Sequence, residues 1–226
     1  MTSAHATHNT TTPLSVALRD CTSQAHERAE GSDFMSELLN GDLKPSAVSA
    51  LTGQLWFVYR ALENAVRRVA TTPIVAPIVD TRLQRVAALE NDLAHLLGID
   101  WAEQVKMLPA TSRYVDRLDS FGEEDAACVV AHHYVRYLGD ISGGQVIAAR
   151  LGVLYDIAPE ALKFYDFSAI GKIPPYRTRY RQQLNALPVT EKQRAKLIEE
   201  ANEAFAMNSA VFTDLYEVCV ERPVNR

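Results

Sequence analysis

Apolar residues recur at three- and four-residue spacing along almost the whole chain, and this periodicity constrains the fold more than any other feature. Such a stripe covers one face of an α-helix. The clearest case is the last one, where Thr190 and Gln193 form a capping-box pattern ahead of a stripe from Leu197 to Cys219. Ten Gly and ten Pro in 226 residues are few for a fold with many tight turns, and we find no convincing strand pair, repeat or domain linker. The sequence predicts one all-α domain of about eight helices.

Turn-forming residues divide this periodicity into segments. Pro13 and Pro45 begin two helical patterns, which stop at Gly31 and at Thr72. Between them lies a short apolar segment at 34–39. Further helices are expected at about 79–97, 111–119, 176–186 and 190–219. We expect residues 1–12 to form a disordered tail, 13–219 the folded domain and 220–226 a short C-terminal tail.

The composition argues against several classes of protein. With 23 Lys+Arg, 28 Asp+Glu and a net charge of −5, the chain is a poor candidate for binding nucleic acid or an anionic membrane. No apolar run approaches the ~20 residues of a membrane span, and the first residues lack the features of a signal peptide. The three cysteines are widely spaced, as is usual in a reducing compartment. We expect a cytoplasmic monomer.

A glycine-rich segment interrupts the pattern between about 123 and 155. Gly139, Gly143 and Gly144 lie within six residues, and each Gly in a helix interior costs ~1 kcal/mol relative to Ala. One interpretation is a loop between two helices. The other is a helix whose backbone can approach a flat or small ligand closely, because Gly139 and Gly143 share one face.

The first helical segment carries a polar stripe beside its apolar one. Arg19, Ser23, His26 and Glu30 recur at intervals of three and four residues. Taken alone, His26 is more simply a surface or hydrogen-bonded core histidine than a metal ligand. Adjacent histidines at 132 and 133 point about 100° apart on a helix, so they cannot chelate one metal together.

Four segments, in order, resemble one known family. Residues 24–30 with Phe34 and Met35 resemble the proximal helix of haem oxygenases, and His133 through Gln145 resembles their distal helix. Residues 85–92 and 199–212 match two further family segments. The resemblance covers about 13–219 and is closest to the soluble bacterial type. It implies a biliverdin-producing monooxygenase in which haem b is both substrate and cofactor. O₂, with electrons from a ferredoxin or an NADPH-dependent flavoprotein reductase, would open haem at the α-meso carbon to biliverdin IXα, CO and Fe²⁺.

The resemblance also implies a site. His26 would bind the haem iron, with Glu30 orienting its ring. Asp140 would hold a distal water and Arg136 would fix Asp140. The other residues implied on the distal side are Gly139, Gly143, Gly144, Tyr59, Arg85 and Asn208. Those implied to hold or contact haem are Arg19, Met35, Tyr134, Ser142, Arg177, Arg181, Phe205 and Phe212. The family more often has Lys at the positions of Arg19 and Arg177.

Simpler interpretations stay open for part of this set. Arg136 and Asp140 could form a solvent-exposed ion pair, and Met35, Phe205 and Phe212 could be plain core.

Two other functions compete. A haem carrier on the same fold would need His26 and the cations but not the distal residues. A thiaminase-like hydrolase would need a nucleophilic cysteine, for which Cys128 is the candidate. The basic residues Lys172, Arg177, Arg179 and Arg181 could dock an acidic electron donor or simply form a solvated face.

Overall fold

The computed structural model describes residues 12–220, and almost all of the regular structure in that range is helical. The α-helices are α1 Leu14–Glu30, α2 Asp33–Asn40, α3 Ser46–Val69, α4 Val86–Leu97, α5 Trp101–Gln104, α6 Pro109–Asp119, α7 Ala126–His133, α8 Gly139–Leu154, α9 Ile173–Asn185 and α10 Glu191–Cys219. Six 3₁₀ turns lie at Ala76–Ile78, Thr81–Leu83, Glu123–Asp125, Pro159–Ala161, Lys163–Tyr165 and Ser168–Ile170. No β-strand occurs between residues 12 and 220, which confirms the all-α prediction.

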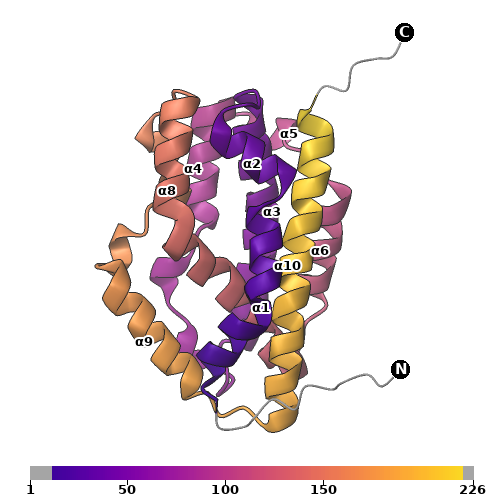
Figure 1. Ribbon diagram of the computed structural model, residues 1–226, viewed down its shortest axis with the longest axis vertical. Helices are drawn as coiled ribbons and strands as arrows, with labels where there is room; N and C mark the ends of the chain where they lie inside the picture. The colour runs from indigo at the N-terminus through magenta and orange to yellow at the C-terminus, as the bar shows by residue number, and fades with distance from the viewer. Residues whose placement is uncertain (1–11, 221–226) are drawn as a thin grey trace.

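The long helices pack around one continuous hydrophobic core. α10 contacts both α1 and α7, while α3 lies against α4 and α6. In Figure 1, α1 and α10 run side by side, and α9 meets α1 at the lower end of the view. The capping box that begins α10 is present, since Thr190 Oγ1 accepts a hydrogen bond from Gln193 N at 3.3 Å. α10 therefore begins where the sequence predicts.

The glycine-rich segment belongs to a nearly continuous helical stretch, so the loop interpretation is wrong. α7 leads through one π-helical turn, Tyr134–Leu138, directly into α8. We call Ala126–Leu154 the distal helix. A π-turn inserts an extra residue and rotates the side chains that follow, and it is frequent at functional sites.

The structure corrects some helix boundaries. The helix expected at 79–97 begins only at Val86, because the preceding residues form two 3₁₀ turns. Pro77 has no N–H to donate, and the Asp80 carboxylate accepts from Arg82 N at 3.0 Å, which favours a turn. α2 and α5 bring the number of described α-helices to ten rather than about eight. The predicted tails at 1–12 and 220–226 lie almost wholly outside the described residues.

None of the helices in the described range is long and apolar enough to cross a membrane.

Candidate active site

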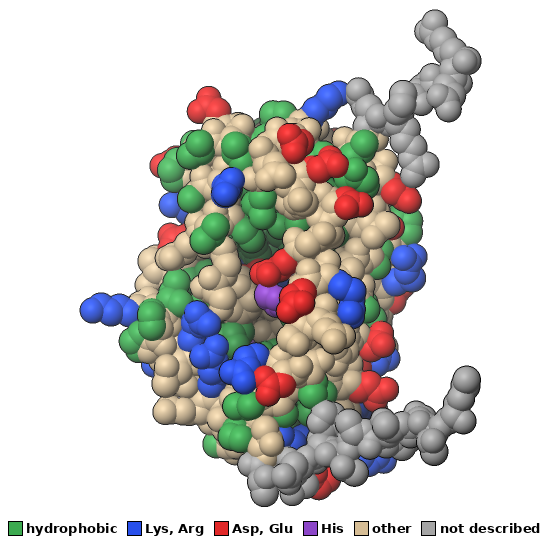
Figure 2. Space-filling model, in the orientation of Figure 1, with side chains coloured by type: hydrophobic (Ala, Val, Ile, Leu, Met, Phe, Trp, Pro, Cys, Tyr) green, Lys and Arg blue, Asp and Glu red, His purple; other side chains and the backbone are tan. Residues whose placement is uncertain are grey.

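A cavity of about 370 Å³ opens between α1, the distal helix and α9. Its lining includes His26 from α1, Tyr134 and Gly139 from the distal helix, Arg177 from α9 and Phe205 from α10. Figure 2 shows a histidine in a hollow on this face, with carboxylates beside it and a group of Lys and Arg side chains over α9. Residues far apart in the sequence thus meet in one cavity of ordinary ligand-binding size.

The imidazole of His26 is held from two sides. Its Nδ1 lies 3.4 Å from Oε2 of Glu30, one turn further along α1. Phe205 presents its ring to the imidazole at 75°, with the two centroids 5.5 Å apart. Because Glu30 occupies Nδ1, Nε2 is the nitrogen available to a metal.

The opposite wall is bare helix. Outside the helix's own backbone, no described atom lies within 4 Å of a Cβ built on Gly139 or Gly143. Ser142 also lines the cavity, and its hydroxyl donates to the Leu138 carbonyl at 2.6 Å. Gly139 and Ser142 give the cavity a flat face, and Gly143, one turn beyond Gly139, is equally open but does not line the cavity itself.

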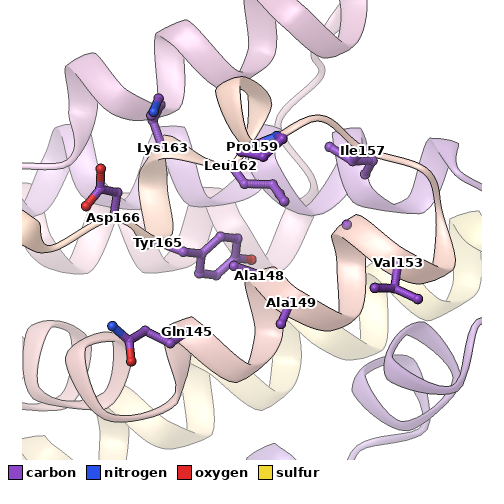
Figure 3. A pocket seen from close by; sticks show the side chains of 11 residues that line it. Gln145, Ala148, Ala149, Val153, Ile157, Pro159, Leu162, Lys163, Tyr165 and Asp166 are labelled. Carbon is purple, nitrogen blue, oxygen red and sulfur yellow. The ribbon is translucent and has the colours of Figure 1, made fainter.

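Gly144 does not belong to that face, contrary to the prediction. A Cβ on Gly144 would lie 3.3 Å from Cδ1 of Tyr165. Figure 3 shows the Tyr165 ring against the side of α8 that carries Ala148 and Ala149. Gly144 therefore makes room for Tyr165 on the other side of the helix and not for a ligand.

A buried polar cluster lies behind the flat face. Arg136 donates from Nη1 to Oδ1 of Asn208 at 2.8 Å, and its Cζ lies 5.0 Å from the ring centroid of Tyr59. Nη2 of Arg136 is 4.0 Å from Oδ2 of Asp140. Three buried atoms of this cluster have no hydrogen-bond partner among the described residues: the Tyr59 hydroxyl, Arg136 Nε and Asp140 Oδ2. Buried polar groups of this kind bind water or substrate.

Burial changes the protonation of this cluster. It raises the pKa of Asp140 well above its usual range and lowers the pKa of Arg136. A carboxyl whose pKa is raised holds its proton more readily than a free aspartate does, and a protonated carboxyl donates a hydrogen bond.

Cations surround the mouth of the cavity. Arg19, Arg177 and Arg181 all line it, together with the Tyr134 phenol. Arg19 is exposed and already bonds Asp20, at 2.8 Å from Nε. Arg177 Nε is buried and has no partner among the described residues. Burial raises the pKa of Tyr134, and Arg181 partly opposes that rise. The rim therefore suits an anionic group on the ligand.

Arg85 does not join the distal cluster as predicted. Its guanidinium donates to the backbone carbonyls of five residues on two neighbouring loops, at positions 82, 83, 84, 164 and 166. Asp92 accepts from the backbone N–H groups of Lys163 and Phe164, both at 2.8 Å. Arg85 and Asp92 thus clamp the turn that carries Phe164, whose ring contacts Tyr59.

Two predicted ligand contacts are core residues. Met35 is buried, and Phe212 stacks on Phe34 with centroids 6.1 Å apart; neither lines the cavity. Sequence reasoning missed other lining residues, including Thr22, Val135 and Leu138. Thr22 precedes His26 by one turn and could have been found from that spacing. The other two are ordinary apolar residues and carry no signal of their own.

Cys128 is not placed to act as a nucleophile. It is fully buried on α7 and does not line the cavity, and burial raises the pKa of its thiol to about 12. A thiol of this pKa stays protonated and unreactive at neutral pH. The hydrolase alternative therefore has no support.

A second, larger cavity of about 590 Å³ lies between α8 and residues 157–166. Figure 3 shows its mostly apolar lining, and it shares no residue with the His26 cavity. The His26 cavity is the better site because it brings a histidine, cations and an open helix face together.

These features define an all-α protein with a cavity that joins a histidine, a helix face without side chains and a rim of arginines. A family model described as "Heme oxygenase" matches residues 12–214. Heme oxygenase 2 of Mus musculus is 36% identical over 211 residues, which cover 92% of this chain and 67% of that protein. Heme oxygenase 1 of Homo sapiens is 36% identical over 208 residues, 91% of this chain and 72% of that protein.

A solved structure agrees with these sequence matches. Heme oxygenase-1 of the cyanobacterium Synechocystis, crystallised in complex with heme, superimposes with a TM-score of 0.85 at 34% identity. The match covers 92% of this chain and 94% of that one. This chain belongs to the haem oxygenase family.

Proposed function

We propose that this chain cleaves haem b at its α-meso carbon and releases biliverdin IXα, CO and Fe²⁺, using O₂ and electrons from an external donor. The observation that carries the proposal is that one cavity joins His26 to the bare face at Gly139, with cations at its mouth. When bound, haem supplies an iron that binds and activates O₂ beside the ring that is cleaved.

The residues present fit such a ligand. Nε2 of His26 would hold the iron, with Glu30 beside Nδ1 orienting the ring. Gly139 and Gly143 would let the macrocycle lie against the helix backbone. At the rim, the buried Nε of Arg177 has no protein partner, and a propionate would supply one.

The distal cluster would control protons. Ordered water between Asp140, Arg136 and Tyr59 would satisfy their three unpartnered atoms. The Asp140 carboxyl would hold one of these waters behind the glycine face, where the water can relay protons. Arg136, held by Asn208, would keep Asp140 in place. No acid–base side chain projects from the glycine face itself, so protons would arrive through water.

A non-catalytic haem carrier is the second candidate, and the buried distal cluster favours the enzyme over it. The test is to add haem and a reductant to the protein in air and follow the Soret band, with chromatography of the products. Loss of the band with formation of biliverdin supports the enzyme. A stable Soret band identifies a carrier.

The donor would dock at the basic surface of α9, where Lys172 and Arg179 are exposed beside Arg181. A ferredoxin or an NADPH-dependent flavoprotein reductase with an acidic surface would be attracted to such a patch. We place the protein in the cytoplasm as a monomer, on the composition and cysteine usage described above.

A further inference from the structure

Two buried aromatic side chains outside the cavity join α9 to the distal helix. Nδ1 of His133 and the phenol oxygen of Tyr180 form a hydrogen bond of 2.7 Å. Their rings are stacked, with centroids 5.7 Å apart and planes inclined by 7°. Both residues are 2% exposed. The His133 ring also packs on Tyr137, with centroids 4.5 Å apart.

The pair is uncharged. Burial lowers the pKa of His133 to about 3 and raises the pKa of Tyr180 well above its usual range. Neither residue lines the His26 cavity, so neither touches a ligand there. The pair therefore acts on the site only through what it holds in position.

The pair connects the two sides of the cavity's rim, which are Tyr134 on the distal helix and the arginines of α9. His133 is the last residue of α7 and directly precedes the π-turn, whose first residue, Tyr134, lines the cavity. Tyr180 lies on α9 between Arg177 and Arg181, which line the cavity from the opposite side. The distance across the rim thus depends on how α9 sits against the π-turn.

The other hydrogen bonds of α9 lead elsewhere. At its C-terminal end, Asn185 Oδ1 accepts from the N–H of Ser15 in α1 at 2.9 Å. Tyr176 donates to Oδ2 of Asp80 at 2.9 Å, and Gln183 donates to the Pro77 carbonyl at 2.6 Å. Both partners belong to the segment of 3₁₀ turns at 76–83. These bonds hold α9 along its outer side, whereas the bond to His133 fixes it to the helix that faces the ligand.

We propose that His133 and Tyr180 are positioning residues that set product specificity by fixing α9 against the π-turn. The inference rests on the proposed function. The rim arginines hold the haem propionates, so the placement of α9 sets the rotation of haem in its own plane. That rotation would decide which meso carbon is cleaved.

The test uses Tyr180→Phe and His133→Phe, which each remove the bond and keep a stacked ring. Tyr176→Phe is the matched control, because it removes a phenol hydroxyl from the same buried face of α9 without touching the distal helix. Wild type and Tyr176→Phe should give one biliverdin isomer. Each of the other variants should form a second isomer in an amount that chromatography detects, because the loss of one neutral hydrogen bond changes an equilibrium about fivefold. The double variant should form no more of the second isomer than either single variant, because both substitutions remove the same hydrogen bond.

Binding to the apoprotein supplies a second readout. Each variant is titrated with ferric haem and with its dimethyl ester, which lacks the propionate charges. The preference for haem over the ester should fall about fivefold in Tyr180→Phe and His133→Phe, and it should not change in Tyr176→Phe. Circular dichroism and thermal melts establish that the variants are folded, and His133→Phe carries the test where Tyr180→Phe does not fold.

Unchanged isomers together with an unchanged preference for haem overturn the inference. If the wild type forms no biliverdin, the proposed function fails, and the ratio of the two affinities alone then decides whether the pair positions the rim.

Discussion

Replacing Gly143 with Ala should make the apoprotein more stable and weaken its binding of haem. A glycine inside a helix costs about 1 kcal/mol relative to Ala. Outside the helix backbone, no described atom lies within 4 Å of a Cβ at this position, so the added methyl group meets no crowding that would offset the gain. We expect about 1 kcal/mol of added stability, or roughly 2–4 °C in the melting temperature of a domain of this size. The same methyl group would keep haem from lying against the backbone and weaken binding roughly tenfold.

Gly144→Ala is the matched control one residue away. Its Cβ would lie 3.3 Å from Tyr165, so the stability gain should be smaller, while haem binding should be nearly unchanged because Gly144 faces away from the cavity. The measurements are urea unfolding of the apoproteins and titration with ferric haem. If Gly143→Ala binds haem as well as the wild type, or if Gly144→Ala impairs binding more than Gly143→Ala, the assignment of the open face is wrong.

Three further variants test the proximal, distal and buried polar groups. His26→Ala should lose the axial iron ligand, and added imidazole should restore part of the turnover; an unchanged iron coordination spectrum would contradict the assignment. Asp140→Ala should bind haem but consume reductant with little biliverdin, and a normal yield would rule out the proton role. Burial alone would raise the pKa of Glu200, but hydrogen bonds from His132 and Arg117 lower it to about 2, from 4.5. A lowered pKa stabilises the fold above pH ~4.5 by about 3 kcal/mol, and this stability is lost as the pH falls toward 2. Glu200→Gln should therefore flatten the pH dependence of urea unfolding between pH 4.5 and 2, and an unchanged slope would refute the pKa shift.

The sequence predicted the helices well because their signals are local. The capping box at Thr190 and the stop at Gly31 both mark helix ends in the structure. The segment after Pro73 was predicted less well. There an Asx turn at Asp80 and the hydrogen bonds of Glu63 to the N–H groups of Arg85 and Val86 decide where α4 starts. Glu63 is more than 20 residues from its partners, so no local pattern predicts this contact.

For the site, too, the predictions that depend on local spacing agree with the structure, and those that depend on distant contacts do not. His26 with Glu30, and Gly139 with Gly143, share a helix face by spacing alone, and the structure keeps each pair together. Gly144 differs, because its surroundings depend on a turn twenty residues further along the chain that places Tyr165 beside it. The π-turn also has no signal in the sequence, although it sets the directions in which Tyr134 and the residues after it point.

The three layers of the distal side have different physical tasks. The glycine face gives up helix stability so that the backbone itself can meet a ligand. Behind it, Tyr59, Arg136 and Asp140 each bury a polar atom that has no hydrogen-bond partner among the described residues, which costs further stability. The clamp that Arg85 and Asp92 form on the 163–166 turn lies beyond that cluster and is fully hydrogen-bonded. The clamp holds the turn that carries Phe164, and the Phe164 ring packs against Tyr59. The clamp therefore supports the polar cluster from outside. Substitution of Arg85 should therefore loosen the distal cluster without removing any group that touches a ligand.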